Sequence, residues 1–367
     1  MRIEAAVLPA RGAPLSLQEV RLEEPRPDEA RVHVLACGVC HADRLAQHGD
    51  LPFPAPGVLG HEGAGVVEAV GEAVTGLRAG DRVVLSMPWC GHCRHCLAGQ
   101  PRYCEHVLRM IAGGARLDGT TALRDASGAV LHSHFFGQSA FATHCVVRAN
   151  QAVRVGDDID LEALGHVGCG VATGAGAIWN VLRPEAGSSV VVFGVGTVGL
   201  AAVMAARNSA AARIVAVDRQ PVRLALAREF GATEAIDATD VADLAGLVRE
   251  ACGGPADRTL ECTGNLSVLR AAVDSIGMLG VCGLVGGAPA GAELTLEHHT
   301  TMIGKRVVGI HGGEGRSSEL IGGVLELQRQ GRFPIERLVS TFALADADAA
   351  MAAAHHGEVV KPVLLTT

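Results

Sequence analysis

Short apolar segments, separated by glycine and proline, dominate the first 150 residues of the chain. Such segments lie at 31–36, 63–70, 81–85 and 142–147. Apolar runs of about four to eight residues, rich in valine and bounded by turn residues, are typical of β-strands. We therefore predict that this part of the chain is mainly β, with irregular loops between the strands.

The pattern changes near residue 170, where apolar strands begin to alternate with helical segments. A continuous apolar run at 188–193 is followed by an alanine-rich helix at 198–208 and by a strand at 213–217. Strands that alternate with helices indicate βαβ units and a parallel sheet. The same alternation predicts further elements at 222–230, 259–262, 266–275, 281–285, 307–310 and 361–365.

Length and charge limit the classes of protein to consider. A chain of 367 residues corresponds to about two domains. The uncharged segment at 186–206 contains four glycines, which favours a buried strand, turn and helix over a membrane span. The formal net charge is −8 and no block of basic residues is present, so neither nucleic acid nor an anionic membrane is an expected partner.

Eleven cysteines and sixteen histidines are the unusual feature of the composition. The N-terminal sequence MRIEAAVLPARG has no apolar secretion segment, so we expect a cytoplasmic protein. In a reducing compartment, clustered cysteine and histidine indicate metal binding in place of disulfides. Five of the cysteines lie in apolar segments and are expected in the core; they are Cys37, Cys145, Cys252, Cys262 and Cys282.

One cluster has four cysteines within 15 residues. Cys90, Cys93, Cys96 and Cys104 follow the spacing C-x2-C-x2-C-x7-C. Four thiolates at this spacing can surround a structural zinc ion as a tetrahedron. An iron–sulfur cluster is the alternative, because bacterial ferredoxins also use C-x2-C-x2-C. Their fourth cysteine precedes proline, whereas Cys104 precedes Glu105, so we predict zinc.

A glycine-rich turn follows the first predicted strand of the second half. Gly194, Gly196 and Gly199 form the pattern GxGxxG between that strand and a helix. The glycines permit a tight turn and bring the helix N-terminus to a pyrophosphate. Asp218 ends the next strand, where a carboxylate binds the adenosine ribose and repels a 2′-phosphate. NAD is the expected cofactor, although the adjacent Arg219 would weaken the discrimination against NADP.

Three further candidate ligands are dispersed along the chain. Cys40, His61 and Cys169 each lie among glycines, which leave backbone room for the close approach of an ion or a cofactor. Their spacing alone does not connect them.

The segment Gly60-His-Glu-Gly63, the four-cysteine cluster and the GxGxxG turn together resemble the zinc-dependent medium-chain alcohol dehydrogenases. The resemblance covers essentially the whole chain. Within that family, the segments at 132–139, 140–144 and 283–286 are most similar to the aryl (benzyl) alcohol dehydrogenases.

The resemblance implies an α/β fold with two interleaved domains. A Rossmann domain with a doubly wound parallel sheet would be inserted in a mainly-β, GroES-like catalytic domain that carries both zinc sites. The implied boundaries are 1–170 for the catalytic domain, 171–312 for the dinucleotide-binding domain and 313–367 for the return to the catalytic domain.

The resemblance also implies roles for individual residues. Cys40, His61 and Cys169 would hold a catalytic zinc and leave a fourth position open. Asp43 would steady His61 through its second ring nitrogen, and Glu62 would lie behind the metal. The implied cofactor contacts are Arg223 near the ribose, Thr173 and Val198 near the nicotinamide, and Lys361 near the pyrophosphate.

The expected function is NAD-dependent oxidation of an alcohol to an aldehyde, with zinc as Lewis acid and hydride transfer to the nicotinamide. An aryl, allylic or other apolar primary alcohol is the expected substrate. The cofactors would be two Zn²⁺ per chain and NAD, and the family usually forms homodimers or homotetramers. A nucleotide-binding protein without catalysis is an alternative, and the complete ligand set argues against it.

The chain departs from the family in the residues that would release a proton. Many members have Ser or Thr two residues after the first zinc ligand, and some have His three residues further on. Here these positions are Ala42 and Leu45. Water with His41 or His48 is one substitute, although a contact of His41 with cofactor phosphate, and a place for His48 in a loop, explain these residues without a relay. The other hypothesis is a different reaction: a thiol-adduct (formaldehyde-type) dehydrogenase, or a reductase of a conjugated carbonyl or iminium.

Overall fold

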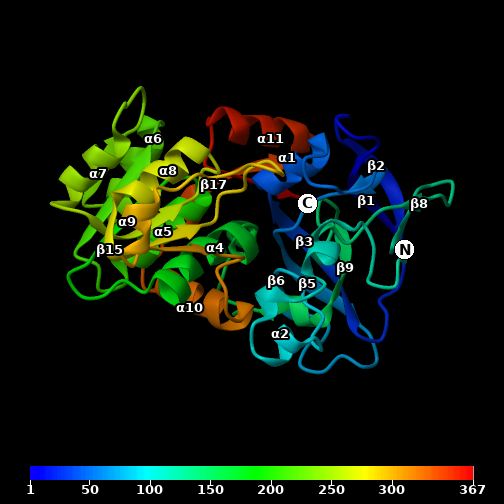
Figure 1. Cartoon of the computed structure of the whole chain (residues 1–367). Coiled ribbons are helices and arrows are strands. Elements are labelled where there is room, and N and C mark those ends of the chain that lie inside the picture. The colour runs from blue at the N-terminus through cyan, green and yellow to red at the C-terminus, as the bar shows by residue number, and fades with distance from the viewer. Residues whose placement is uncertain (367) are drawn as a thin grey trace. The chain divides into compact units, whose positions relative to one another are not determined.

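The computed structural model describes residues 1–366, and these form two compact units. The first unit consists of Met1–Cys169, Arg316–Gly322 and the segment from Glu336 onward. The second consists of Gly170–Gly315 and Gly323–Ile335. Figure 1 labels many of the elements of both units.

Two largely antiparallel sheets form the framework of the first unit. One has the strand order β4-β1-β2-β7-β8, and the other has the order β10-β6-β5-β3-β18-β17, with β9 also paired to β3. The first sheet contains β1 (Arg2–Leu8), β2 (Ser16–Leu22), β4 (Gly57–Val58), β7 (Leu123–Arg124) and β8 (Val130–Leu131). The second contains β3 (Glu29–Gly38), β5 (Gly63–Val70), β6 (Arg82–Leu85), β9 (His144–Arg148), β10 (Ala152–Arg154), β17 (Val339–Ala343) and β18 (Lys361–Leu365).

Strand β3 is the centre of the second sheet, because it pairs with β5, β9 and β18. Its buried valines, Val32 and Val34, alternate with half-buried His33 and Leu35. A strand with one buried face produces this period of two. Val32 and Val34 belong to a hydrophobic cluster that also includes residues of β1, so the core of this unit joins both sheets. The helices of the unit are α1 (His41–His48), α2 (Arg94–Leu97), α3 (Val107–Ala112) and α11 (Ala347–His356).

A six-stranded parallel sheet forms the second unit, in the order β13-β12-β11-β14-β15-β16. Strands β11 to β13 extend it in one direction and β14 to β16 in the other, which is the doubly wound Rossmann arrangement. Such sheets bind nucleotides where the order reverses, here beyond the carboxyl ends of β11 and β14. The strands are β11 (Ser189–Phe193), β12 (Arg213–Asp218), β13 (Glu234–Asp237), β14 (Ala256–Glu261), β15 (Ile276–Leu284) and β16 (Arg306–Gly309).

The sequence of β11 explains its central place in this sheet. All five residues of Ser189–Phe193 are buried, as expected for a parallel strand covered on both faces. The helices are α4 (Ala172–Gly176), α5 (Thr197–Arg207), α6 (Pro221–Phe230), α7 (Leu244–Cys252), α8 (Leu266–Ser275) and α9 (His298–Met302), and α10 (Ser317–Arg329) passes from the first unit into the second.

Periodicity located most elements of the second unit, and the α/β fold class predicted from the sequence is confirmed. The predicted helix at 266–275 is α8, and the predicted strand at 63–70 of the first unit is β5. The prediction missed the helical stretch at 167–182, whose glycines lower helix propensity. A Cβ on Gly174 would lie 2.1 Å from the carbonyl oxygen of Val198, so glycine permits the close packing of α4 on α5.

The expectation that five cysteines lie in the core was too broad. Cys37, Cys145 and Cys282 are buried, as expected, whereas Cys252 and Cys262 are half-buried. Cys252 ends α7 and Cys262 follows β14, so both lie where the chain leaves the core.

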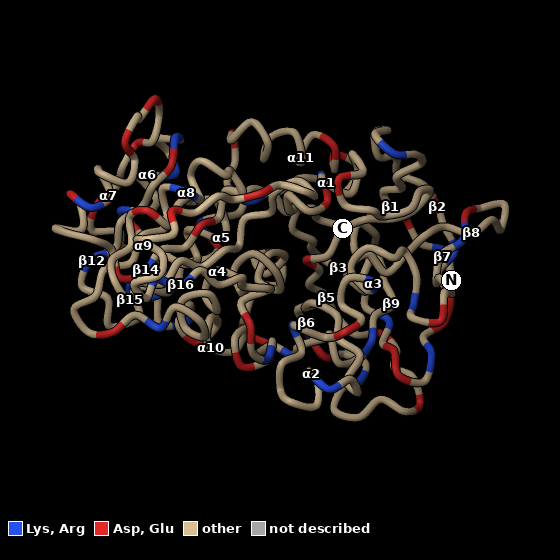
Figure 2. The backbone as a smooth tube through the Cα atoms, in the orientation of Figure 1, with Lys and Arg blue, Asp and Glu red and all other residues tan. Residues whose placement is uncertain are grey.

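Acidic and basic residues are interspersed along the backbone of both units (Figure 2). Among the described residues, none of the helices is both long enough and apolar enough to cross a lipid bilayer.

Candidate active site

The first unit brings together the three dispersed candidate ligands. Cys40 precedes α1, His61 lies between β4 and β5, and Cys169 lies in the helical turn Val167–Val171. One donor atom from each of these residues, and one from Glu62, lie within 4.8 Å of one another. Segments far apart in the sequence therefore converge on one cluster of two thiols, one imidazole and one carboxylate.

Asp43 connects two of these ligand segments. Its Oδ2 accepts the backbone N–H of Cys40 (2.9 Å) and its Oδ1 accepts that of Gly60 (3.0 Å). The same Oδ1 lies 3.2 Å from Nδ1 of His61. Asp43 is the third residue of α1, so its contact with the Cys40 N–H also forms part of the capping box of this helix. The interaction that begins the helix thus also positions the imidazole.

The donor set fits a metal ion. Nε2 of His61 is buried and has no hydrogen-bond partner, although buried nitrogens are nearly always paired. The hydrogen bond from the Cys169 thiol, together with nearby His61, lowers the pKa of Cys40 well below its ordinary value. Cysteine sulfur and an unpartnered imidazole nitrogen, within 4.8 Å of one another, are donors that zinc prefers.

Glu62 lies beside this set in a buried ion pair. Lys361, from β18, contacts Oε2 of Glu62 and donates a hydrogen bond to the carbonyl of Val39 at 2.7 Å. Burial raises the pKa of Glu62, and the Lys361 ammonium acts in the opposite direction. The Lys361 ammonium therefore lies against the Glu62 carboxylate, beside the candidate ligands. A contact between Lys361 and a pyrophosphate stays a prediction.

The glycines near the ligands serve mainly the packing of the protein on itself. A Cβ on Gly168 would lie 1.9 Å from the carbonyl oxygen of Leu85, and one on Gly60 would lie 2.4 Å from the backbone nitrogen of Phe141. Gly60 also has a φ of 88°, which other residues rarely adopt. The sequence suggested that these glycines leave room for an ion or a cofactor. The structure adds that they let neighbouring backbone segments pack closely together next to the ligands.

Sequence reasoning assigned no role to the aromatic side chains that cover His61. The ring of Phe136 stacks on the imidazole at 4.2 Å between centroids, and Phe135 approaches it edge-on at 5.5 Å. Phe136 has a φ of 50°, and Ser139 anchors the turn by accepting the Phe135 N–H at 3.0 Å. Such a strained backbone persists where neighbouring contacts hold it in place. The consecutive phenylalanines are the only sign of this turn in the sequence.

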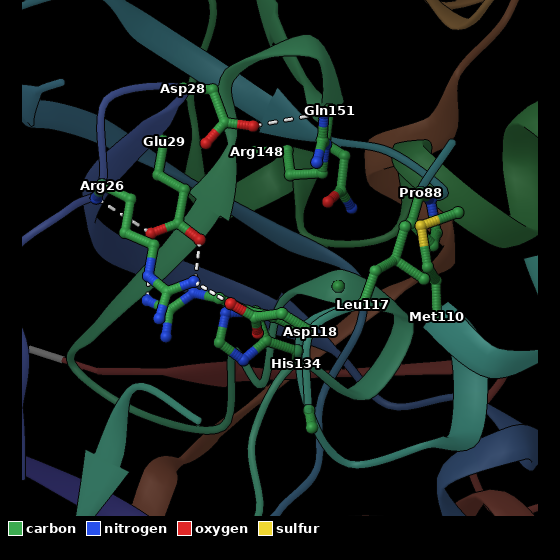
Figure 3. Close-up of a pocket in the computed structure, with 13 residues that line it drawn as sticks. Arg26, Asp28, Glu29, Pro88, Met110, Leu117, Asp118, His134, Arg148 and Gln151 are labelled. Atoms are coloured by element: carbon green, nitrogen blue, oxygen red, sulfur yellow. Dashed lines mark hydrogen bonds and ion pairs between the residues drawn. The ribbon is translucent and has the colours of Figure 1, made fainter. Parts of the chain in front are cut away.

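A cavity of about 200 Å³ adjoins the beginning of this turn (Figure 3). His134, which contributes to its wall, is buried, and burial with the nearby Arg116 lowers its pKa to about 3. Arg116 forms a two-pronged ion pair with Glu29, at 2.6 and 3.0 Å. None of the candidate metal ligands lines this cavity, so we regard it as part of the support of the turn.

Ala42 and Leu45, where many family members have relay groups, offer no proton-carrying side chain. Both residues are half-buried on α1, and Ala42 packs against the hydrophobic core. His41 and His48, at the two ends of the same helix, are exposed. The pKa of His355, on α11, is lowered mainly by the positive charge of Arg44. His41 and His48 are close enough to contribute to the same effect.

The four clustered cysteines also converge. Cys90, Cys93, Cys96 and Cys104 are buried, and the pairs of sulfur atoms in contact lie 3.5–3.9 Å apart. Zinc–sulfur bonds of about 2.3 Å place the corners of a tetrahedron about 3.8 Å apart. An iron–sulfur cluster would hold the cysteines further apart, because several iron and sulfide atoms lie between them. The geometry fits one zinc ion.

The second unit forms the predicted glycine-rich turn. Gly194 has a φ of 84°, and a Cβ on Gly199 would lie 2.0 Å from the Gly194 carbonyl oxygen. Asp218, at the end of β12, accepts the N–H of Val195 at 2.8 Å. The side chain of Arg223, on α6, lies beside this turn, because a Cβ built on Gly196 would be 4.0 Å from its Nη1 atom.

The remaining cofactor candidates also lie near this turn. Thr173 is mostly buried in α4, and Val198 lies in the first turn of α5. The close contact of Gly174 with Val198 brings these two helices together. Nε of Arg223, near this turn, is buried without a hydrogen-bond partner.

The role of Asp43 leads to a prediction about metal retention. Replacement of Asp43 by Asn removes the charge that orients His61, so the affinity of this site for zinc should fall about 10–100-fold. We expect dialysis against a weak chelator to leave Asp43→Asn with one zinc per chain, measured by elemental analysis, and the unchanged protein with two.

The matched control is Asp118→Asn, which removes an exposed ion pair with Arg26 and touches neither metal site. It should retain both zinc ions. Equal zinc content in Asp43→Asn and the unchanged protein would show that Asp43 does not hold the ligand set.

Comparison with known proteins places the chain in a family. The model of the alcohol dehydrogenase GroES-like domain matches residues 26–157, and that of the zinc-binding dehydrogenase matches residues 197–328. The geraniol dehydrogenase of Castellaniella defragrans is 42% identical over 99% of this chain and 97% of that protein. An S-(hydroxymethyl)glutathione dehydrogenase of Escherichia coli is 35% identical over 99% of this chain and all of that protein.

A solved structure agrees with the sequence matches. The benzyl alcohol dehydrogenase of Acinetobacter calcoaceticus superposes with a TM-score of 0.96 and 38% identity, with both chains fully covered. Two domain models, long relatives and a common fold all agree with the sequence-based resemblance. The chain therefore belongs to the zinc-dependent medium-chain alcohol dehydrogenases, a family of oxidoreductases.

Proposed function

We propose that this protein oxidises an apolar primary alcohol, of the aryl or allylic type, to an aldehyde with NAD. The observation that carries the proposal is the convergence of Cys40, His61 and Cys169, which offers zinc three ligands. With the nearby Glu62 carboxylate engaged by Lys361, the fourth position would be left for a substrate oxygen. The relatives named for geraniol and benzyl alcohol support the substrate class. In both compounds the reacting CH₂OH group is attached to an unsaturated carbon.

The residues of the first unit would each have a definite task. A bound zinc supplies a Lewis acid that lowers the pKa of the alcohol hydroxyl. Two thiolates and a neutral imidazole balance the charge of the ion, and Asp43 keeps the His61 ring in position. Phe136 covers one face of that ring, which excludes water from it. Lys361 holds the Glu62 carboxylate in its buried ion pair.

The second unit would bind NAD at the reversal point of its sheet. The turn at Gly194–Gly199 would receive the pyrophosphate, and Asp218 would accept hydrogen bonds from the adenosine ribose. Thr173 and Val198 would contact the nicotinamide and Arg223 the ribose. The Lys361 ammonium is engaged by Glu62 and by the Val39 carbonyl, so we do not assign it to the pyrophosphate. We also propose the boundaries 1–170, 171–312 and 313–367 for the domains, with the exception that residues 323–335 belong to the second unit, and a cytoplasmic location.

A second reaction is favoured by one observation. Ala42 and Leu45 provide no relay, and a relative is named for S-(hydroxymethyl)glutathione. Oxidation of a thiol adduct is therefore the second candidate. For the alcohol reaction, water together with exposed His41 or His48 would carry the proton away.

Reduction of NAD in the presence of separate substrates tests the proposal. Benzyl alcohol and geraniol should each give a kcat/KM at least about tenfold above that for S-(hydroxymethyl)glutathione, because the aromatic turn near His61 favours apolar substrates. Preference for the thiol adduct would establish the second candidate. Absence of NAD reduction with all three compounds in a protein that contains two zinc ions would refute both.

The carboxylate of Asp218 leads to a prediction about the cofactor. Asp218→Ser should lower kcat/KM with NAD at least about tenfold and improve the ratio for NADP, because a repulsive charge and a ribose acceptor are lost. Asp237→Asn, at the end of the neighbouring β13, is the matched control and should leave both values unchanged. An unaltered NADP to NAD ratio in Asp218→Ser would contradict the assignment.

An exposed apolar surface supports self-association through the second unit. Met278, Leu279 and Met302 are 73%, 74% and 65% exposed, and a Cβ on Gly304 would meet the Leu279 side chain. Exposed apolar side chains that gather on one surface mark interaction sites. We propose that a second copy of the chain covers this surface in a homodimer or homotetramer.

Light scattering after gel filtration checks this proposal. Leu279→Asp should reduce the mass to a smaller assembly, because a carboxylate would be buried in an apolar contact. Val222→Asp, on α6, changes a side chain that is 71% exposed and should preserve the assembly. A Leu279→Asp protein with the mass of the unchanged protein would place the interface elsewhere.

A further inference from the structure

Three polar side chains from separate strands meet on one side of the seven-stranded sheet. His33, Glu68 and His144 lie on β3, β5 and β9, and β3 pairs with both other strands (Figure 1). His33 is directly opposite His144 in the register of β3 and β9, and opposite Val66 in the register of β3 and β5. None of the three polar residues is part of the cysteine-containing sites.

A bulge in the strand pairing positions Glu68. Arg31 pairs with Ala69 and Val32 pairs with Val67, so Glu68 has no direct partner on β3. Such irregularities change the direction of a side chain. Oε1 of Glu68 lies 3.3 Å from Nε2 of His144, while Oε2 lies 3.2 Å from Nε of Arg31. Arg31 thus holds one carboxylate oxygen and leaves the other facing the imidazole.

The two imidazole rings lie against one another, and contacts hold the His144 ring in place. They stack with centroids 4.7 Å apart and planes inclined by 18°. Nδ1 of His144 lies 3.1 Å from the Thr143 hydroxyl oxygen, which orients the ring with Nε2 toward Glu68. The His144 side chain is only 14% exposed, so its surroundings restrict its rotation.

One donor atom from each of the three residues lies within 4.8 Å of those of the other two. Bonds of about 2.0–2.2 Å from zinc to nitrogen or oxygen place two ligands of one ion about 3–4 Å apart. Because the lone pair of an imidazole nitrogen lies in the plane of its ring, the His33 ring would turn out of the stack to bind the same ion as His144 and Glu68. Two imidazoles and one carboxylate, without a thiolate, suit divalent transition metals such as Zn²⁺, Ni²⁺ and Cu²⁺.

We propose that His33, Glu68 and His144 form a third metal site, which takes a divalent transition metal ion with water in its remaining positions. The ion would tie β5 and β9 to β3 through side chains on one face of the sheet. Since it binds the folded sheet and not an unfolded chain, it would raise the stability of the protein by mass action. The site is independent of the proposed alcohol oxidation.

Calorimetric titration with NiCl₂ tests this proposal on the zinc-containing protein, purified without a polyhistidine tag. The unchanged protein should bind one Ni²⁺ per chain at this site, and its melting temperature should rise with Ni²⁺. His33→Ala, His144→Ala and Glu68→Gln should each weaken this binding at least about tenfold, because each removes a ligand. The same variants should lose the rise in melting temperature.

The double variant His355→Ala/His356→Ala provides a matched control. These neighbouring histidines are exposed on α11, and their rings are 5.6 Å apart and inclined by 50°. The control should keep the Ni²⁺ affinity of the unchanged protein. Zinc content and melting temperature without Ni²⁺ verify that each variant is folded. No Ni²⁺ binding by the unchanged protein, or unchanged affinity in a folded His33→Ala/His144→Ala variant, would overturn the proposal.

Discussion

The buried carboxylate of Asp43 is the contact on which the arrangement of the ligands depends. A charge without solvent is costly unless hydrogen bonds compensate it. Here two backbone N–H groups and the His61 ring provide that compensation. These partners belong to the segments that carry Cys40 and His61, so satisfying one carboxylate fixes the separation of two ligands. A single electrostatic requirement thereby determines both the start of α1 and the orientation of the imidazole.

Close backbone packing completes the arrangement on the other side. The helical turn that carries Cys169 approaches β6 so closely that only glycine fits at position 168. Glycine is also required at position 38, where a Cβ would lie 2.0 Å from the Gly165 carbonyl oxygen. The three ligand segments are thus held by a hydrogen-bonded carboxylate at one side and by backbone contacts at the other. Because both kinds of contact are stiff, little reorganisation is needed when a metal binds.

Local patterns made much of this protein predictable. The apolar run of β11, the glycines after it and Asp218 at the end of β12 all lie within one βαβ unit, so sequence spacing predicted their proximity. The four clustered cysteines are likewise close in sequence. Cys40, His61 and Cys169 are different, because only the folded sheets join them and only the family resemblance suggested the set. The ion pair of Lys361 with Glu62 could not be predicted either, since it depends on the pairing of β18 with β3.

The short span of the cysteine cluster has a consequence for the order in which the molecule matures. Closing a small loop costs little chain entropy, so Cys90 to Cys104 can gather around an ion while most of the chain is still unstructured. The set that includes Cys40 and Cys169 demands long-range pairing, which is slow to form. Lys361, which pairs with Glu62 beside that set, comes from β18, the last strand of the chain. We expect an ion at the four-cysteine cluster to be acquired early in folding, and one at the proposed site of Cys40, His61 and Cys169 only when the surrounding strands have formed. With this order of folding, the chain would not expose a metal ion at the proposed catalytic site before the strands and helices around it have formed.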